Sequence, residues 1–350
     1  MDKNVNKKDT AIFTVVIPIH NSEDTIERTL ASLISSKDYI SEVLIVNDDC
    51  TDNTLDKVEL FNGFYPIRIV SNNIRPHSPS VSRRVGLLQC KSKYITFVDS
   101  DDCLSSSSLK YVYEQLKDID CLVMHCKTAY YESGYFNKDN IEFSDNSCGG
   151  NFYKTSYLLG NKLLFHYDLY MCEDEYFNER VDMFIRYCDK KNDFSILYYD
   201  YPVYEVHHDT GKLSLALSNW VDYCIKWHLL YKQFLTEDFI KYFESDEKLF
   251  KMFEDNYIDS FIFCYFMSQC LSMDIDSDYK FEENKEHFIR ALKYYKKIFN
   301  GDSDFILSYY KKNRDKVNAL MQGAIESTGI EIKNRSYLYF KLFINKLNVK

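Results

Sequence analysis

Three carboxylates that directly follow a short apolar run are the residues of this chain best suited to chemistry. They lie in the segment Phe97-Val98-Asp99-Ser100-Asp101-Asp102. Hard divalent cations prefer oxygen ligands, and Mg²⁺ or Mn²⁺ is commonly held by one or two carboxylates together with substrate phosphates. The segment is therefore a candidate site for a divalent metal and a diphosphate. A solvated turn or a helix N-cap is the alternative interpretation, because aspartate is common in both.

The elements that must position this segment alternate between strand and helix over the first hundred residues. Apolar runs predict strands at 12–18, 43–46, 66–70 and 94–98, and amphipathic stretches predict helices at about 22–34, 51–60 and 79–90. This alternation indicates a mostly parallel sheet with helices on both faces, whose ligand site lies at the carboxyl ends of the strands. Polar residues gather at those ends, namely His20, Asn21, Asp48, Asp49, Asn72, Asn73 and the acidic segment.

The remainder of the chain divides into a mixed part and a helical part. From 104 to 210 we expect helices at 109–116 and 173–187, strands at 121–124, 194–198 and 203–207, and a loop at 147–150. Beyond about 215 the strand pattern fades, and amphipathic helices are predicted at 220–234, 250–271, 285–299 and 304–325.

Four motifs in order resemble the nucleotide-sugar-binding half of a family 2 glycosyltransferase of the GT-A fold. They are VVIPIHN (15–21) with TLASL (29–33), IVNDDCTDNT (45–54), SRRVGL (82–87) and FVDSDD (97–102). GNFYKTS (150–156), leading to Glu173-Asp174, extends the resemblance to about 10–210. We therefore expect an α/β GT-A fold, Rossmann-like and mostly parallel, with a C-terminal helical appendage. The expected domains are 10–214, split into a nucleotide-sugar-binding half (10–103) and an acceptor-binding half (104–214), and a helical region at 215–350.

The resemblance also implies roles for individual residues. Asp48 would accept a hydrogen bond from the nucleotide base, Arg83 would reach the base or the diphosphate, and Asp174 stands at the position of the catalytic base, with Glu173 beside it. Asp101 is the expected metal ligand, with Asp99 near the ribose or the metal and Asp102 supporting the metal shell. The residues assigned to the nucleotide sugar are Pro18, His20, Asn21, Asp48, Arg83, Asp99, Ser100 and Asp101. The residues assigned to the metal are Asp99, Asp101, Asp102 and His208.

Several positions depart from the family pattern or carry less information. His20 stands where the family usually has tyrosine, Asp49 where it has glycine, and Arg84 where it has asparagine. Neighbouring residues on a strand point to opposite faces, so at most one of His207 and His208 is expected to face the site, and we favour His208. The histidines at 77 and 125 are expected to be structural or loop residues.

Eleven scattered cysteines without a C-x-x-C pair indicate reduced thiols in a cytoplasmic protein.

Charge is distributed unevenly along the chain and limits the choice of partners. The net charge is −10, which disfavours nucleic-acid binding, whereas residues 291–350 alone carry +7. The segment 337–347 also alternates lysines with apolar and aromatic residues, as basic helices on anionic membrane surfaces do. We expect a cytoplasmic protein that can bind peripherally at the inner face of the cell membrane. A solvated helix packed on the catalytic domain, or an oligomer contact, is the alternative for this tail.

Together these features predict a metal-dependent, inverting glycosyltransferase that uses Mn²⁺ or Mg²⁺. The predicted donor is a nucleotide-diphosphate sugar linked to UDP, and the predicted acceptor is a hydroxyl of a surface glycan or lipid-linked glycan, in capsule, lipopolysaccharide or teichoic acid. A nucleotidyltransferase is one alternative, although the acidic segment after the first strand does not resemble the Gly-rich basic loop that such enzymes carry. A non-catalytic GT-A-like binding or scaffold protein is the other.

Overall fold

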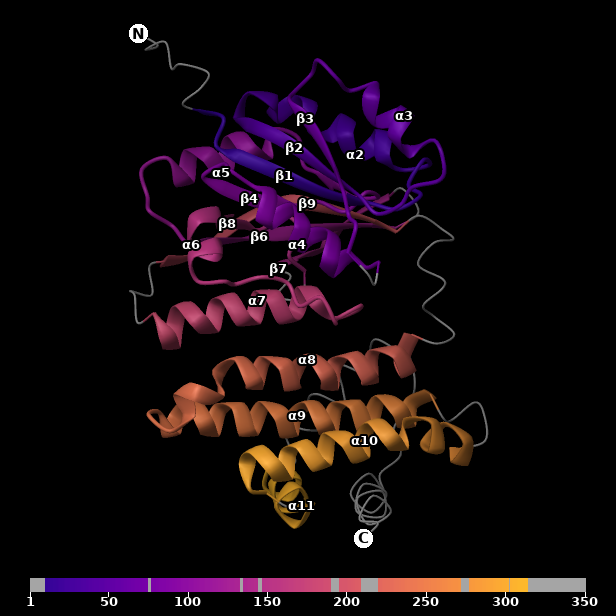
Figure 1. Cartoon of the computed structure of the whole chain (residues 1–350), viewed down its shortest axis with the longest axis vertical. Helices are drawn as coiled ribbons and strands as arrows, with labels where there is room; N and C mark the ends of the chain where they lie inside the picture. Colours follow the sequence, from indigo (N-terminus) through magenta and orange to yellow (C-terminus); the bar gives the residue numbers. More distant parts are fainter. Residues whose placement is uncertain are drawn as a thin grey trace. The chain divides into compact units, whose positions relative to one another are not determined.

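The computed structural model describes residues 10–74, 77–132, 135–143, 147–189, 195–208, 220–271, 277–301 and 303–313. The chain divides into two compact units, Met1–Leu213 and Ser214–Lys350. The first unit contains a sheet with helices on both faces, and the second contains helices (Figure 1). That these units act as separate catalytic and helical domains stays a prediction.

Four parallel strands form the first half of the sheet. They are β1 (Phe13–Ile19), β2 (Ile40–Asn47), β3 (Ile67–Ser71) and β4 (Tyr94–Phe97), in the spatial order β3-β2-β1-β4. The register places Val15 beside Val43 on one side and Thr96 on the other. The helices that connect these strands are α2 (Ile26–Ser32), α3 (Thr54–Glu59) and α4 (Pro79–Gln89), with a 3-10 helix (Ile34–Tyr39) before β2. The predicted α/β architecture is therefore present in the half of the sheet that carries the acidic segment.

The second half of the sheet is mixed in direction. The spatial order continues β8-β6-β9-β5, with β7 paired to β6. These strands are β5 (Cys103–Leu104), β6 (Val123–Glu132), β7 (Tyr135–Phe143), β8 (Phe152–Lys154) and β9 (Ile196–His208). The accompanying helices are α5 (Ser108–Leu116), α6 (Thr155–Gly160) and α7 (Glu173–Met183). Helix α7 continues into a π-helical turn at Phe184–Cys188. The two short strands predicted at 194–198 and 203–207 are one long strand, because β6 pairs with it along its length.

Side chains alternate between the two faces of the sheet and form two cores. Along β1, Val15 and Ile17 pack with α2, α3 and α5, whereas Val16 packs with α4, α6 and α7. The second core contains an aromatic group in which the Phe165 and Phe177 rings stack 4.0 Å apart and Phe97 meets Phe177 at 6.1 Å. Phe97 ends β4 and Phe177 lies one turn into α7, so this contact holds the end of the acidic strand near the start of α7.

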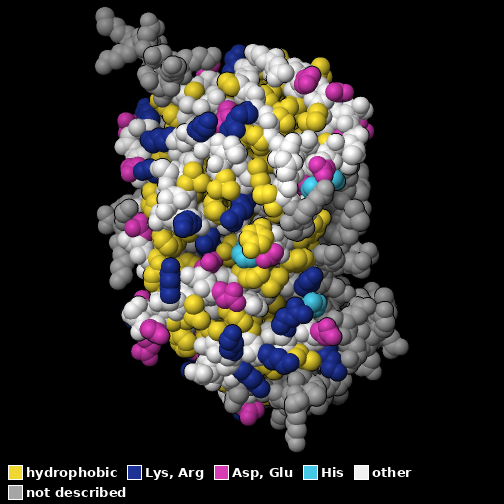
Figure 2. All heavy atoms as spheres, in the orientation of Figure 1, with side chains coloured by type: hydrophobic (Ala, Val, Ile, Leu, Met, Phe, Trp, Pro, Cys, Tyr) yellow, Lys and Arg dark blue, Asp and Glu magenta, His cyan; other side chains and the backbone are white. Residues whose placement is uncertain are grey.

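The second unit packs α8 (Trp220–Phe243), α9 (Glu247–Leu271) and α10 (Ser277–Phe299) against one another, followed by α11 (Ser303–Lys312). Its core is aromatic, with Phe243, Phe253 and Phe299 in ring contact. None of the helices in the described ranges combines the length and apolar character needed to cross a membrane. On the face in Figure 2, Lys and Arg side chains are dispersed among hydrophobic ones. The basic segment 337–347 lies outside the described residues.

Helix α4 approaches the sheet closely because Gly86 has no side chain. A Cβ atom at Gly86 would lie 2.4 Å from Cγ1 of Val16 on β1, which is too short for a contact. This close approach places the preceding turn of α4, with Arg83, next to the ends of β1 and β4.

Gly86→Ala is therefore expected to lower the free energy of unfolding by about 1–3 kcal/mol, because the added methyl overpacks the interface between α4 and β1. Gly160→Ala is the matched control, since a Cβ at Gly160 meets no atom within 4 Å. Urea unfolding measures both variants. Equal stability of the two would show that the close approach at Gly86 is not required.

Candidate active site

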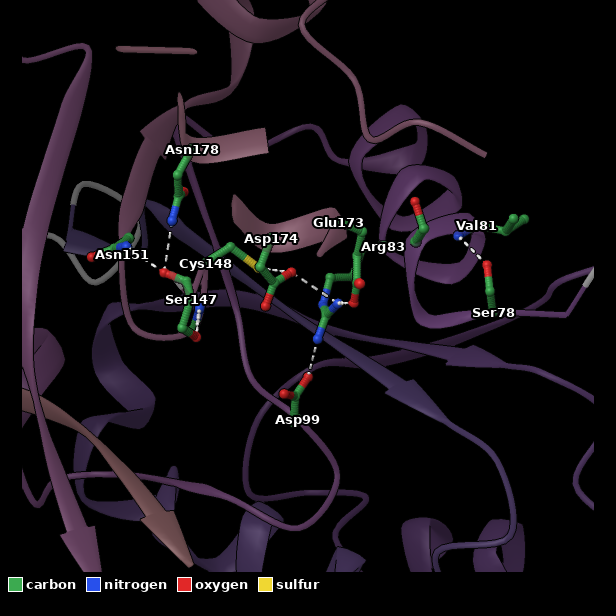
Figure 3. Close-up of polar contacts among 12 residues, drawn as sticks. Ser78, Val81, Arg83, Asp99, Ser147, Cys148, Asn151, Glu173, Asp174 and Asn178 are labelled. Carbon is green, nitrogen blue, oxygen red and sulfur yellow. Dashed lines mark hydrogen bonds and ion pairs between the residues drawn. The ribbon is translucent and has the colours of Figure 1, made fainter. Parts of the chain in front are cut away.

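The centre of the candidate site is the guanidinium of Arg83, which contacts three carboxylates from two other elements (Figure 3). Arg83 Nη2 donates to Oδ1 of Asp99 at 2.6 Å, and Nη1 donates to Oε1 of Glu173 at 2.7 Å. The same Nη1 lies 3.0 Å from Oδ1 of Asp174. Arg83 is only 4% exposed, and its contact with Glu173 is buried, whereas the side chain of Asp99 is 38% exposed. Asp99 of the acidic loop and Asp174, 75 residues apart in the chain, are therefore joined by one side chain.

Local structure explains how each group reaches this point. Ser78 caps α4 by accepting a hydrogen bond from the Val81 N–H at 3.2 Å, and Pro79 occupies the first turn, where its missing N–H costs nothing. Helix α7 begins directly at Glu173, after Cys172 in the left-handed conformation with φ of 58°. Carboxylates at a helix N-terminus are stabilised by the helix dipole. Both helices therefore start where their charged residues can converge on the carboxyl end of β4.

One positive charge faces three carboxylates, so the site retains protons more strongly than isolated acids do. Burial raises the pKa of Glu173 to about 7, with the charge of Asp174 adding to the rise and Arg83 opposing it. Burial also raises the pKa of Asp174, and Arg83 again opposes the shift. Cys148 donates to Oδ1 of Asp174 at 3.2 Å. The side-chain contacts with Arg83 and Cys148 both use Oδ1 of Asp174.

Asp102 differs from the other two carboxylates of the acidic loop because it is buried. Asp102 is 7% exposed, and its oxygens accept hydrogen bonds from the Tyr204 hydroxyl (2.8 Å) and the His207 N–H (2.9 Å). Burial and the charges of Asp99 and Asp101 raise the pKa of Asp102 to about 8. The other two carboxylates of the loop, Asp99 and Asp101, are only partly buried, and carboxylate oxygens grouped in this way suit a divalent cation. Asp102 would then support that site through its hydrogen bonds.

The loop backbone is held by the helix that follows β1. Arg28 Nη2 donates to the carbonyl of Asp101 at 2.6 Å, and Thr29 donates to the carbonyl of Ser100 at 3.0 Å. The Ser100 hydroxyl also lies 2.7 Å from that of Ser22. These contacts hold residues 100 and 101 against α2 and the segment that precedes it.

A second polar group lies at the ends of β1, β2 and β3. Asp48 is 5% exposed, and its Oδ1 accepts from Nδ2 of Asn72 at 3.0 Å and contacts Nδ1 of His77. His77 Nε2 lies 3.1 Å from Oδ2 of Asp49, and His20 Nδ1 lies 2.6 Å from the Asp48 carbonyl. His77, which sequence patterns assign to an ordinary loop, therefore belongs to this group. Its position soon after the polar end of a predicted strand is a signal that could have indicated this.

The remaining predicted donor residues lie around the same edge. Pro18, near the end of β1, is opposite Val46 in the register. Asn21 has φ of 49° and accepts a hydrogen bond from the Thr51 N–H at 2.8 Å, which ties the loop after β1 to the loop after β2. The structure thus gathers Pro18, His20, Asn21 and Asp48 in one region, and Arg83, Asp99, Glu173 and Asp174 in another. A direct contact of Arg83 with the base or the diphosphate stays a prediction.

The structure describes the side chain of only one of the two histidines at the end of β9. His207 stacks on Tyr131 with ring centroids 4.7 Å apart, and its N–H binds Asp102. The backbone of His208 pairs with Glu132, whereas its side chain lies outside the described part of the structure. Its assignment as a metal ligand stays a prediction. His125, expected to be structural, lies 3.1 Å from Asp182.

Comparison with known proteins identifies the family of this site. Residues 14–180 match the model described as Glycosyl transferase family 2. The chain carries a family 2 glycosyltransferase domain. Over 126 residues the chain is 33% identical to the minor teichoic acid biosynthesis protein GgaA of Bacillus subtilis (strain 168), an alignment that covers 34% of this chain and 28% of GgaA. The chain therefore spans less than a third of that relative.

Two further comparisons extend beyond the glycosyltransferase domain. The chain is 26% identical over 242 residues to the poly(ribitol-phosphate) beta-N-acetylglucosaminyltransferase TarP of Staphylococcus aureus (strain N315), covering 63% of this chain and 71% of TarP. The crystal structure of S. aureus TarS 1–349 in complex with UDP-GlcNAc is similar with a TM-score of 0.55 at 19% identity, covering 92% of this chain and 93% of that one. This likeness confirms the predicted α/β GT-A fold with C-terminal helices.

The raised pKa of Glu173 predicts how stability depends on pH. A carboxyl whose pKa is higher in the folded than in the unfolded state stabilises the fold at low pH, and this contribution is lost as the pH rises through the folded-state value of about 7. The melting temperature is therefore expected to fall between pH 5.5 and 8.5, as measured by scanning calorimetry in metal-free buffer. Glu173→Gln keeps an oxygen that can accept a hydrogen bond from Arg83. It should make the fall in melting temperature over this pH range smaller by several degrees. Glu59→Gln, at an exposed position on α3, should keep the wild-type slope, and the same slope in all three proteins would contradict the assignment.

Proposed function

We propose that this protein is a metal-dependent, inverting glycosyltransferase that transfers a sugar from a UDP-linked donor to a hydroxyl of a surface glycan. The observation that carries the proposal is the buried Arg83, which joins an acidic loop suited to a metal and a diphosphate to an acidic pair suited to proton transfer. A transfer reaction of this kind needs both groups within one site, because the bond to the leaving diphosphate breaks as the acceptor hydroxyl attacks.

The donor would span the two polar groups at the edge of the sheet. The base would meet Asp48 through Oδ2, because Oδ1 already contacts Asn72 and His77. The diphosphate would then lie at Asp99, Ser100 and Asp101, whose loop follows β4, the strand on the other side of β1 from β2. A divalent ion held there by Asp99 and Asp101 would supply charge stabilisation for the leaving diphosphate. Support for this placement comes from the three carboxylates grouped at residues 99–102, whose oxygens suit such an ion.

Asp174 is the proposed base. The acceptor oxygen attacks the anomeric carbon, its proton passes to the carboxylate of Asp174, and the bond between that carbon and the diphosphate oxygen breaks with inversion. Asp174 must be ionised to accept the proton, and the Arg83 guanidinium at 3.0 Å favours its charged form. Glu173, whose pKa is the one raised to about 7, would hold the proton that the crowded carboxylates share. Arg83 would thus keep the base charged and in place.

The proposed acceptor is a teichoic acid or a similar surface glycan. TarP is named as acting on poly(ribitol phosphate), and GgaA is named for minor teichoic acid biosynthesis. These names support the glycan class and leave the sugar open. A cytoplasmic location, binding to the inner face of the cell membrane through the basic tail, and oligomer formation stay predictions.

A matched pair of variants tests the proposal. Asp101→Ala should remove most of the Mn²⁺-dependent binding of UDP in isothermal titration calorimetry, because it removes the expected metal ligand. Asp174→Asn should leave UDP binding unchanged and lower the release of UDP from the donor sugar by about 10²-fold or more, because general-base assistance contributes about 10²–10⁴-fold. The donor is first found by screening nucleotide sugars for slow hydrolysis by the wild-type protein.

The two variants separate the competing interpretations. If wild-type protein binds UDP neither with nor without Mn²⁺, the chain is a scaffold that kept the fold. If Asp174→Asn retains most of the turnover, another group is the base. If Asp101→Ala retains metal-dependent UDP binding, the metal is not held by this loop.

A further inference from the structure

We propose that Tyr204 is a positioning residue that sets the spacing between the acidic loop at residues 99–102 and Asp174. The inference rests on the proposed function, in which these are the diphosphate end and the base of one reaction. Tyr204 lies in β9, more than a hundred residues after the acidic loop, and is 1% exposed. It belongs to none of the motifs that mark the site in the sequence.

The Tyr204 hydroxyl binds the acidic loop at both ends. It accepts a hydrogen bond from the Asp99 N–H at 3.1 Å and donates one to Oδ2 of Asp102 at 2.8 Å. The second oxygen of Asp102 accepts from the N–H of His207, also on β9. Strand β5, which follows the loop, pairs with β9 so that Leu104 is opposite Tyr204. The loop is therefore fastened to β9 through one phenol and one carboxylate, in addition to the strand pairing.

The Tyr204 side chain is fixed in turn by two glycines. A Cβ at Gly149 would lie 2.6 Å from Cζ of Tyr204, and a Cβ at Gly150 would lie 2.5 Å from its Cβ. Gly150 also has φ of 69°, a conformation that other residues rarely adopt. Only glycine at both positions allows the backbone of this segment to lie against the tyrosine, and Gly150 N–H further binds the Phe97 carbonyl at 3.1 Å.

The glycine segment continues directly to the base. Cys148, fully buried, donates its thiol hydrogen to Oδ1 of Asp174, and the carbonyl of Ser147 accepts from Nδ2 of Asn178 on α7 at 2.9 Å (Figure 3). From Asp174 the contacts return through Arg83 to Asp99. Tyr204, the segment 147–150, Asp174, Arg83 and Asp99 therefore form a closed ring of contacts.

A closed ring restrains the distance between Asp99 and Asp174 from two sides. Arg83 alone would allow the two acids to move apart together with its flexible side chain, whereas the path through Tyr204 uses a rigid ring and backbone. Because misplacing reacting groups by about 1 Å can cost roughly 10²-fold in rate, loosening the path through Tyr204 should reduce turnover more than donor binding. Tyr204 itself touches no substrate in this scheme.

The test is Tyr204→Phe in the full chain, which keeps the ring on the two glycines and removes the hydroxyl. We expect kcat for UDP release to fall by roughly 10- to 100-fold, while the KM for the donor at saturating Mn²⁺ changes little. The Mn²⁺ concentration that supports half-maximal UDP binding in calorimetry should rise severalfold, because the Asp99 N–H and Asp102 lose their partner.

Tyr94→Phe is the matched control, since its buried hydroxyl donates to the Cys121 carbonyl at 3.1 Å, away from the site. It should lower the melting temperature without changing kcat or the Mn²⁺ requirement. If Tyr204→Phe is also destabilised but retains wild-type kcat and Mn²⁺ dependence, the residue is merely structural and the proposal is overturned. If wild-type protein shows no metal-dependent UDP binding, the proposed function itself fails.

A second pair of variants decides the matter if Tyr204→Phe does not fold. Cys148→Ser keeps a hydrogen-bond donor to Asp174, whereas Cys148→Ala removes it with a small change in volume. The ring predicts a lower kcat for Cys148→Ala and recovery in Cys148→Ser. Wild-type kcat in both variants would contradict it.

Discussion

The Arg83 guanidinium lies in a buried position where it contacts Asp99 from the acidic loop and Glu173 and Asp174 from the start of α7. A buried charge is costly unless it is paired, and removing one partner leaves the others uncompensated. Here one positive charge meets three carboxylates, and burial, with the charge of Asp174 adding to it, raises the pKa of Glu173 so that a proton is retained. The geometry and the protonation state of the site both follow from this imbalance. A cation bound at the neighbouring acidic loop would add positive charge that offsets the same carboxylates.

The fold of the first unit brings these charges together by packing that is itself apolar. Gly86 allows α4 to approach β1, and the contact between Phe97 and Phe177 holds the end of β4 near α7. The polar residues that line the site are then attached to elements whose other faces are in the core. Tyr204 adds a connection of a different kind, because its hydroxyl binds the loop and its ring lies against Gly149 and Gly150, next to Cys148, which contacts the base. The site can therefore be held in shape without a ligand.

Much of this arrangement could be predicted from the sequence, because parallel α/β sheets place the carboxyl ends of neighbouring strands at one edge. Apolar runs indicated β1 to β4, and the acidic segment after β4 indicated its place. The contact of Arg83 with Glu173 could not be derived, since it joins residues 90 apart by tertiary packing. Strands β5, β7 and β8 were missed because they carry no clear apolar run, and β9 was split because tyrosines and Asp200 interrupt its pattern. Tyr204, Cys148 and His77 have common side chains whose roles depend on distant partners.

The most direct test of the account concerns Arg83, on which both halves of the site depend. Arg83→Lys keeps the positive charge, but a single ammonium cannot reproduce the planar fork that reaches Asp99 and the acidic pair at once. The measurement is the rate of Mn²⁺-dependent UDP release from the donor sugar, with Arg84→Lys as the control at the adjacent position, whose guanidinium binds the Phe165 carbonyl. The account predicts at least about a tenfold loss for Arg83→Lys, in line with the cost of misplaced catalytic groups, and little change for Arg84→Lys. Wild-type turnover in Arg83→Lys would show that the site does not depend on this guanidinium and would contradict the account.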